Sequence, residues 1–140
     1  MFENECLSLS SVVCDLRYLS MVSQHLHWMV SGATSMQDHQ MLGGLYEACD
    51  GFFDSVAERV VGLGGLAPTV AEQLKYVYAC AKRDGDVASM QGVGELVVRT
   101  AQELNQVAAC EGLSEGTKNL LAGIADELEK QAYFFQQRSR

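Results

Sequence analysis

Three histidines are the side chains in this sequence best suited to metal chemistry: His25, His27 and His39. His27 and His39 lie six residues before and six residues after Ala33, the midpoint of a predicted turn. In an antiparallel helical hairpin, equal offsets from the turn bring side chains level with each other. Neutral imidazole is a common ligand of iron and zinc, so this spacing predicts that the two imidazoles share one ion. His25 is about 200° round the helix from His27 and is expected to point elsewhere.

Four carboxylates follow on the next predicted helix, at Glu47, Asp50, Asp54 and Glu58. The last three are four residues apart, so neighbouring members share a helix face, and such a run taken alone is a solvated acidic face. Asp54 lies 15 residues after His39, which is about 22 Å along a helix, whereas a metal–ligand bond is about 2 Å. One chain therefore cannot place both histidines and the Asp54 and Glu58 pair on one ion.

A second copy of the chain provides the missing carboxylates. If two copies pack this helix antiparallel about a two-fold axis near Glu47 and Ala48, His39 of one copy falls level with Asp54 and Glu58 of the other. The symmetry then produces two identical sites per dimer. Mixed nitrogen and oxygen ligands with open positions suit Fe(II), although zinc, manganese or cobalt fit the same donors.

Two helical hairpins are expected to position these residues. The first apolar stripe runs from Leu9 to Val30 at intervals of three and four and stops at Ser31-Gly32-Ala33, where glycine can adopt the left-handed conformation. Thr34 or Ser35 can cap the second helix, whose stripe runs from Leu42 to Leu63 before Gly64-Gly65.

The second half of the chain repeats this pattern after a long connection. Residues 65–88 form that connection and contain one short helical stripe, Val70, Leu74 and Val77. A third long helix carries Val93 to Val107, and Thr117 is expected to cap the fourth, which extends to Phe135. The sequence therefore predicts an all-α fold: a single domain over residues 1–140, built as a ferritin-like four-helix bundle with one long crossover between the second and third helices.

Composition excludes several functional classes. The 140 residues carry a net charge of −8, so the chain lacks the basic surface of a nucleic-acid-binding module. No apolar run reaches the ~18 residues of a membrane span, and the first residues carry two acids where a secretory signal has Lys or Arg. The five cysteines are odd in number and form no C-x-x-C pair, which favours a reducing, cytoplasmic location.

The ordered set of motifs resembles the Dps-type mini-ferritins over residues 7–137. The matching features are His27-Trp28, Val30-Ser31-Gly32, His39 twelve residues after His27, Leu45-Tyr46, Asp54-Ser55-Val56-Ala57-Glu58-Arg59, Gly64-Gly65 and the segment from Asp126 to Tyr133.

The resemblance implies a hollow homo-oligomeric cage, usually a dodecamer built from two-fold dimers. In that family Fe(II) is oxidised at ferroxidase sites between subunits, with hydrogen peroxide or O2 as oxidant, and ferric mineral is stored inside, which protects against oxidative damage. Carried over by position, His27 and His39 are ligands from one chain and Asp54 and Glu58 are ligands from its partner. Trp28 matches the family's tryptophan near the site.

Two departures qualify the resemblance. The family commonly has a carboxylate four residues after the second histidine, which helps to hold a second iron, and this position is Gly43. The second iron should therefore bind more weakly, with Asp50 and Glu47 as weaker candidates to compensate. Family members that condense DNA use a Lys-rich tail, which this acidic sequence lacks, so DNA binding is not expected.

Two alternative functions remain open from the sequence. In the first, the protein is a cage-forming relative that binds a metal such as zinc without ferroxidase activity. In the second, it is a structural or adaptor bundle, because a histidine on an amphipathic helix is more often a packing residue than a ligand.

Overall fold

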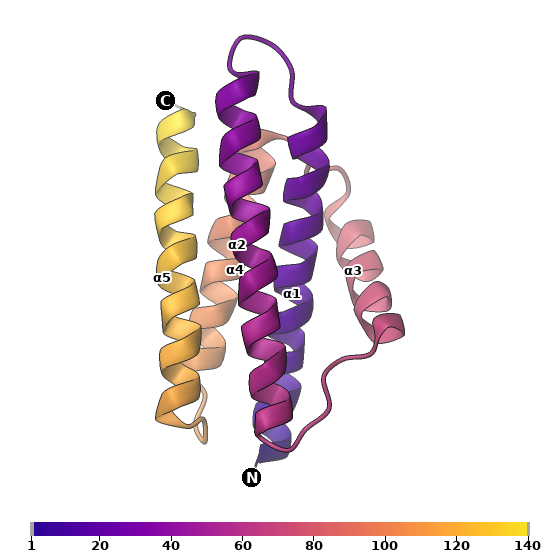
Figure 1. Cartoon of the computed structure of the whole chain (residues 1–140), viewed down its shortest axis with the longest axis vertical. Coiled ribbons are helices and arrows are strands. Elements are labelled where there is room, and N and C mark those ends of the chain that lie inside the picture. The colour runs from indigo at the N-terminus through magenta and orange to yellow at the C-terminus, as the bar shows by residue number, and fades with distance from the viewer. Residues whose placement is uncertain (1, 140) are drawn as a thin grey trace.

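The computed structural model describes the backbone of residues 2–139 and the side chains of residues 9–139. This part of the chain forms five helices, α1 (Phe2–Met29), α2 (Ser35–Gly62), α3 (Val70–Asp84), α4 (Met90–Ala108) and α5 (Glu115–Arg138). Figure 1 shows four long helices side by side, with the shorter α3 on the outer flank of α1. α1 packs along α2, α4 packs along α5, and α1 also packs on α4. The predicted all-helical bundle with one long crossover is confirmed.

Glycines end the first two helices as predicted. Gly32 has φ +93° and Gly64 has φ +90°, a left-handed conformation that side chains with a Cβ rarely adopt. Thr34 occupies the N-cap position of α2, but its hydroxyl makes no bond to the helix backbone. It donates instead to Asp38 Oδ2 at 3.0 Å.

The expected cap of the last helix is wrong by one turn. Ser114 is the N-cap residue of α5, and its hydroxyl accepts a hydrogen bond from the Thr117 backbone N–H at 3.1 Å. Thr117 is fully buried inside the first turn. Both residues are good caps by type, so the sequence alone does not choose between two starts three residues apart.

The crossover contains a helix longer than its short apolar stripe indicated. Thr69 and Glu72 form a complete capping box at the start of α3, and Gly85, with φ +67°, ends it. Polar side chains attach α3 to α1 through the hydrogen-bonded pairs Arg17–Gln73, Tyr18–Asp84 and Tyr76–Asp15.

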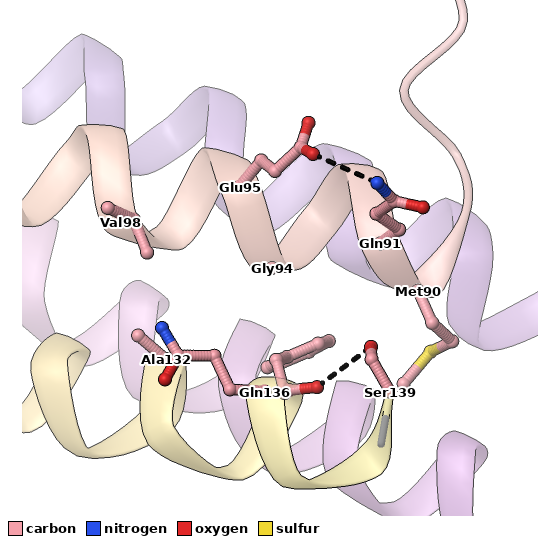
Figure 2. A pocket seen from close by; sticks show the side chains of 9 residues that line it. Met90, Gln91, Gly94, Glu95, Val98, Ala132, Gln136 and Ser139 are labelled. Atoms are coloured by element: carbon pink, nitrogen blue, oxygen red, sulfur yellow. Dashed lines mark hydrogen bonds between the residues drawn. The ribbon is translucent and has the colours of Figure 1, made fainter.

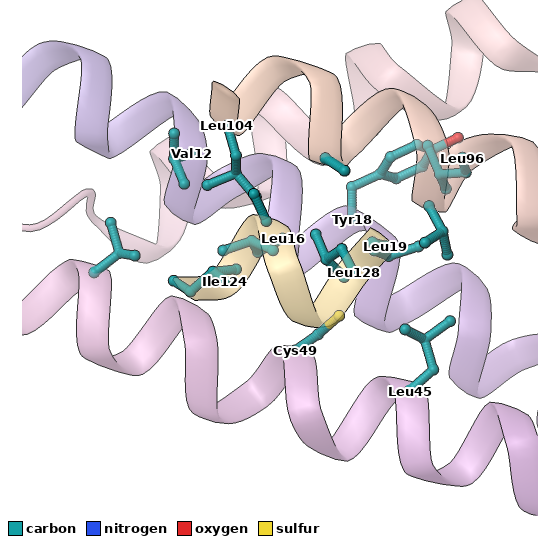
Figure 3. Close-up of a cluster of buried hydrophobic side chains, with 14 of the residues drawn as sticks. Val12, Leu16, Tyr18, Leu19, Leu45, Cys49, Leu96, Leu104, Ile124 and Leu128 are labelled. Atoms are coloured by element: carbon teal, nitrogen blue, oxygen red, sulfur yellow. The ribbon is translucent and has the colours of Figure 1, made fainter. Parts of the chain in front are cut away.

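The core lies between the four long helices. Figure 3 shows leucine, valine and isoleucine side chains from α1, α2, α4 and α5 meeting there, together with Tyr18 and Cys49. Cys14, Cys49 and Cys80 are buried free thiols, Cys110 is exposed, and the Cys6 side chain lies outside the described residues. Within residues 2–139, no helix is both long enough and apolar enough to cross a membrane.

Candidate metal centre

His27 and His39 meet beside the turn that joins α1 and α2. Their rings stack with centroids 3.6 Å apart and planes inclined by 19°. The predicted level placement of these two side chains is therefore confirmed. His27 is half-buried and His39 is exposed, so the pair lies at the surface of the chain.

Each of the two imidazoles is oriented by the backbone of the other residue. His27 Nδ1 lies 2.7 Å from the His39 carbonyl oxygen, and His39 Nδ1 lies 2.9 Å from the His27 carbonyl oxygen. A carbonyl oxygen only accepts hydrogen bonds, so both Nδ1 atoms carry the proton. The lone pair of each neutral ring is then on Nε2, which is the arrangement found in metal-ligating histidines.

The stacking differs from the prediction that both rings share one ion. The stacked rings have centroids 3.6 Å apart and nearly parallel planes, whereas a metal–nitrogen bond is about 2 Å and lies in the ring plane. The two lone pairs therefore do not converge on a common point. In this arrangement each imidazole presents its own Nε2 lone pair.

Gly43 and Tyr46 of α2 enclose the His27 ring. A Cβ atom at Gly43 would lie 3.2 Å from His27 Cε1, so the absence of a side chain makes room for the ring. The Tyr46 ring makes an edge-to-face contact with His27, with centroids 5.2 Å apart and planes inclined by 68°. Tyr46 was noted in the sequence only as a family feature, and its contact with a candidate ligand depends on the packing of α1 against α2.

The carboxylates of α2 lie further along the same helix. Asp54, Glu58 and Glu47 are exposed, and none of them has a hydrogen-bond or ion-pair partner among the described residues. Asp50 differs, because Ser20 donates a hydrogen bond to its Oδ1 at 2.6 Å. No group of three or more His, Cys, Asp or Glu side chains within residues 9–139 lies close enough together to hold a metal ion.

Trp28 does not lie against the histidine pair. It is 67% exposed, and its aromatic contact is with His25, edge-on at 6.4 Å between ring centroids. His25 lines a pocket between α1 and α3 together with Tyr18 and Val77, and its ring contact is with Trp28 rather than with His27 or His39.

Asp38, next to His39, is a buried carboxylate with a structural role that the sequence did not indicate. Arg138 at the end of α5 donates to its two oxygens at 2.8 and 2.9 Å, and Thr34 donates at 3.0 Å. The hydrogen bond from Arg138 lowers the pKa of Asp38. These contacts hold the end of α5 against the turn that carries the histidine pair.

A separate pocket lies between α4 and α5, with a volume of about 350 Å³. Figure 2 shows its lining, in which Gly94 and Val98 of α4 face Ala132 and Gln136 of α5. Gln91 donates to Glu95 at 3.2 Å at its rim. The lining contains no histidine or cysteine, unlike the surroundings of the histidine pair.

The chain is similar to known proteins over most of its length. The ferritin-like domain family matches residues 7–138. DNA protection during starvation protein 2 of Bacillus anthracis is 28% identical over 136 residues, covering 91% of each chain. Antigen TpF1 of Treponema pallidum is 26% identical over 131 residues, covering 89% of this chain and 74% of that protein.

Solved structures match over nearly the whole chain. DpsC from Streptomyces coelicolor is 30% identical with a TM-score of 0.83, covering 96% of this chain and 83% of that chain. Dps92 from Deinococcus radiodurans has the same fold, with a TM-score of 0.83 at 23% identity, over 94% of this chain and 83% of that chain. The chain belongs to the ferritin-like family and, within it, to the Dps-type mini-ferritins.

Proposed function

We propose that this protein binds and oxidises Fe(II) at sites shared between two subunits and stores the ferric product inside a homo-oligomeric cage, in the manner of a dodecameric mini-ferritin. The observation that carries the proposal is the reciprocal bonding of His27 and His39. Each Nδ1–H donates a hydrogen bond to a backbone carbonyl oxygen. Both Nε2 lone pairs are therefore free to bind a metal ion.

Asp54 and Glu58 of a second subunit complete the site in this proposal. Both are exposed carboxylates without partners among the described residues, so their oxygens are free to bind a cation. They cannot reach the histidines of their own chain, since 15 helical residues span about 22 Å. An antiparallel partner about a two-fold axis near Glu47 and Ala48 brings them level with His39.

An exposed apolar stripe supports assembly into oligomers. It follows one side of α3 and the segment before it at intervals of four residues, and consists of Leu66, Val70, Leu74 and Tyr78, which are 60–89% exposed. Several large exposed apolar side chains on one element commonly mark a protein interface. A different side of α3, with Gln73, Tyr76 and Asp84, is held to α1 by polar contacts, so the apolar side is left for a partner subunit.

Iron is the substrate of the proposed reaction. Each of the two adjacent imidazoles offers one Nε2 lone pair, so the pair would hold two Fe(II) ions, one on each histidine. Each Fe(II) gives one electron to hydrogen peroxide, which takes up two protons and leaves as two water molecules. The carboxylates of the partner subunit stabilise the greater charge of Fe(III).

Mixing of two inactive variants tests the shared site. One variant has His27→Ala and His39→Ala, and the other has Asp54→Asn and Glu58→Gln. In a mixed dimer one of the two sites receives intact histidines from one subunit and intact carboxylates from the other. Random reassembly of equal amounts should restore about a quarter of the unmodified rate of Fe(II) oxidation by peroxide.

The control mixes two single variants, one with His27→Ala only and the other with His39→Ala only. No site in this mixture has both histidines. Equal rates for this control and for the complementary mixture would contradict the shared site, as would a purified protein that remains monomeric. Ferric absorbance in stopped flow measures the rate, and light scattering measures the assembly.

A cage that binds zinc without oxidising iron is the second candidate. Gly43 favours it, because a glycine supplies no carboxylate where the family commonly has one. Tight zinc binding together with iron oxidation no faster than in buffer would establish this second function.

A further inference from the structure

Arg138 at the end of α5 forms a closed hydrogen-bonded group with Asp38 and Thr34 at the start of α2. Its Nε and Nη2 donate to the two Asp38 oxygens at 2.8 and 2.9 Å, and Nη2 also donates to the Thr34 hydroxyl at 3.0 Å. That hydroxyl in turn donates to Asp38 Oδ2 at 3.0 Å. A bidentate contact between guanidinium and carboxylate is stronger and more directional than a single hydrogen bond. We name these three residues the α5 clamp.

The start of α2 needs support from elsewhere in the chain. The first four N–H groups of a helix have no acceptor within it, and a capping side chain normally bonds to one of them. Thr34 occupies the N-cap position of α2 but makes no such bond. Asp38, which is 3% exposed, lies in the first turn and is attached to α5 by Arg138. The α5 clamp therefore provides stabilisation that a cap would otherwise provide.

The first turn of α2 leads directly into the histidine pair. His39 follows Asp38, and the His39 carbonyl oxygen is the acceptor for His27 Nδ1. The His39 ring is oriented in return by the His27 carbonyl oxygen. A shift of this part of α2 would therefore disturb both imidazoles at once. Among residues 9–139, the hydrogen-bond partners of Arg138 are Asp38 and Thr34, so any effect of Arg138 on the imidazoles passes through α2.

We infer that Arg138 is a positioning residue of the metal centre. Through Asp38 it holds the first turn of α2, and thereby the two bonds from Nδ1 to carbonyl oxygens that direct the Nε2 lone pairs of His27 and His39. The inference rests on the proposed function, since it concerns the same metal ligands.

The charge of Arg138 and its positioning role have opposite consequences for metal binding. A guanidinium group repels a nearby cation, so removal of its charge would by itself strengthen metal binding. Loss of positioning should weaken metal binding, because removal of groups that orient metal ligands typically costs 10–100-fold in affinity. The sign of the change in affinity therefore separates the two effects.

The test titrates the assembled, metal-free protein with Co(II), whose visible absorption reports binding. We expect Arg138→Ala to bind Co(II) about tenfold more weakly than the unmodified protein. Arg138→Lys keeps the charge but cannot form the bidentate contact, so its affinity should lie between the two. Unchanged or tighter binding of Co(II) by Arg138→Ala would overturn the inference.

Arg99→Ala is the matched control. Arg99 pairs with the buried carboxylate of Asp84, whose side chain is 6% exposed, and the Asp38 side chain is 5% exposed. Asp84 contacts Tyr18 of α1, which lies about 14 Å before His27 along the helix. Arg99→Ala should therefore destabilise the fold but leave the affinity for Co(II) within about twofold. Equal weakening in Arg99→Ala and Arg138→Ala would indicate a general loss of stability and would overturn the positioning role.

Hydrogen exchange of the metal-free protein, followed by mass spectrometry, tests the structural step without any metal. The backbone amides of residues 35–40 should exchange faster in Arg138→Ala than in the unmodified protein or in Arg99→Ala. Equal exchange in all three proteins would show that Arg138 does not hold the first turn of α2.

Failure of the inference is distinct from failure of the proposed function. If the unmodified protein oxidises Fe(II) rapidly and Arg138→Ala binds Co(II) as tightly as the unmodified protein does, the positioning role is wrong and the ferroxidase proposal stands. If the unmodified protein binds Co(II) but oxidises Fe(II) no faster than buffer does, the proposed function is wrong. The Co(II) affinities and the hydrogen exchange then still decide the role of Arg138.

Discussion

Two polar regions of the bundle use similar side chains in opposite ways. The first is the histidine pair with the free carboxylates of α2. The second, which we name the crossover cluster, lies between α1, α3 and α4 and consists of Asp15, Tyr18, Tyr76, Asp84, Arg99 and Glu103. In the crossover cluster the carboxylates find their partners within the chain. Asp84 accepts hydrogen bonds from Tyr18, Arg83 and Arg99, and the hydrogen bond from Arg83 is the main reason that its pKa is held well below the usual range.

The difference separates structural polar groups from groups prepared for a ligand. A buried carboxylate that accepts several hydrogen bonds has few lone pairs left for another molecule. Its removal leaves the buried donors around it unpaired, which destabilises the fold. The histidine pair is satisfied only at Nδ1, and Asp54 and Glu58 have no described partner at all. Unused acceptors at the surface, rather than the presence of acids or histidines as such, are the basis on which we propose a metal and a second subunit at this site.

The largest expected effect follows from removing the ligands of the histidine pair. His27→Ala combined with His39→Ala should lower the rate of Fe(II) oxidation more than about 100-fold, since even groups that only orient metal ligands are worth 10–100-fold. The thermal unfolding temperature should change little, because the lost hydrogen bonds are at the surface. Stopped-flow absorbance and thermal unfolding measure the two effects. Rapid oxidation by the double variant would show that the histidines are not ligands.

The crossover cluster should give the opposite result. Asp84→Ala leaves the buried Tyr18 hydroxyl without its acceptor and removes the partner of Arg99, so the free energy of unfolding should fall by about 2 kcal/mol. The iron oxidation rate per folded site should stay within about twofold, since Asp84 is not a proposed ligand. Urea unfolding measures the first quantity. Asp84→Asn keeps an acceptor for Tyr18, so its free energy of unfolding should lie between those of Asp84→Ala and the unmodified protein.

Glu103 makes the crossover cluster sensitive to pH. Burial, followed by a hydrogen bond to Asp15, raises the pKa of Glu103 from 4.5 to about 7. The folded state therefore holds an additional proton between these values. The contribution of protonated Glu103 to the free energy of unfolding is fully present below pH 4.5 and is lost as pH rises through about 7.

Glu103→Gln keeps a donor to Asp15 at every pH. The variant should be more stable than the unmodified protein above pH 7, by on the order of 1 kcal/mol because the side chain is partly exposed, and the gain should vanish toward pH 4.5. Chemical unfolding at several pH values measures the difference. Glu111→Gln changes an exposed carboxyl and should show no such trend. A gain that does not depend on pH would contradict the assignment to Glu103.

The sequence predicted the helices and the meeting of the two histidines because both depend on local rules. Apolar spacing determines the helices, and equal offsets from a turn at Gly32 place His27 and His39 level. The orientation of the rings was not predictable, since it results from bonds between each Nδ1 and a carbonyl on the other helix. The bond between Asp38 and Arg138 joins residues 100 positions apart, and no local pattern indicates it.

The smallest expected effect concerns the position where the site departs from its family. Gly43→Asp adds a carboxylate four residues after His39, on the same helix face, and should strengthen binding of the second ion. The new Cβ would lie 3.2 Å from His27 Cε1, so the imidazole must move by a few tenths of an ångström, which offsets part of the gain. We therefore expect the rate of Fe(II) oxidation at saturating iron to rise only about threefold.

Gly44→Asp is the matched control, because it adds the same charge to α2 where a Cβ meets nothing within 4 Å. An equal rise in both variants would indicate general attraction of cations rather than a restored ligand, whereas a rise confined to Gly43→Asp would show that this single missing carboxylate limits the second ion.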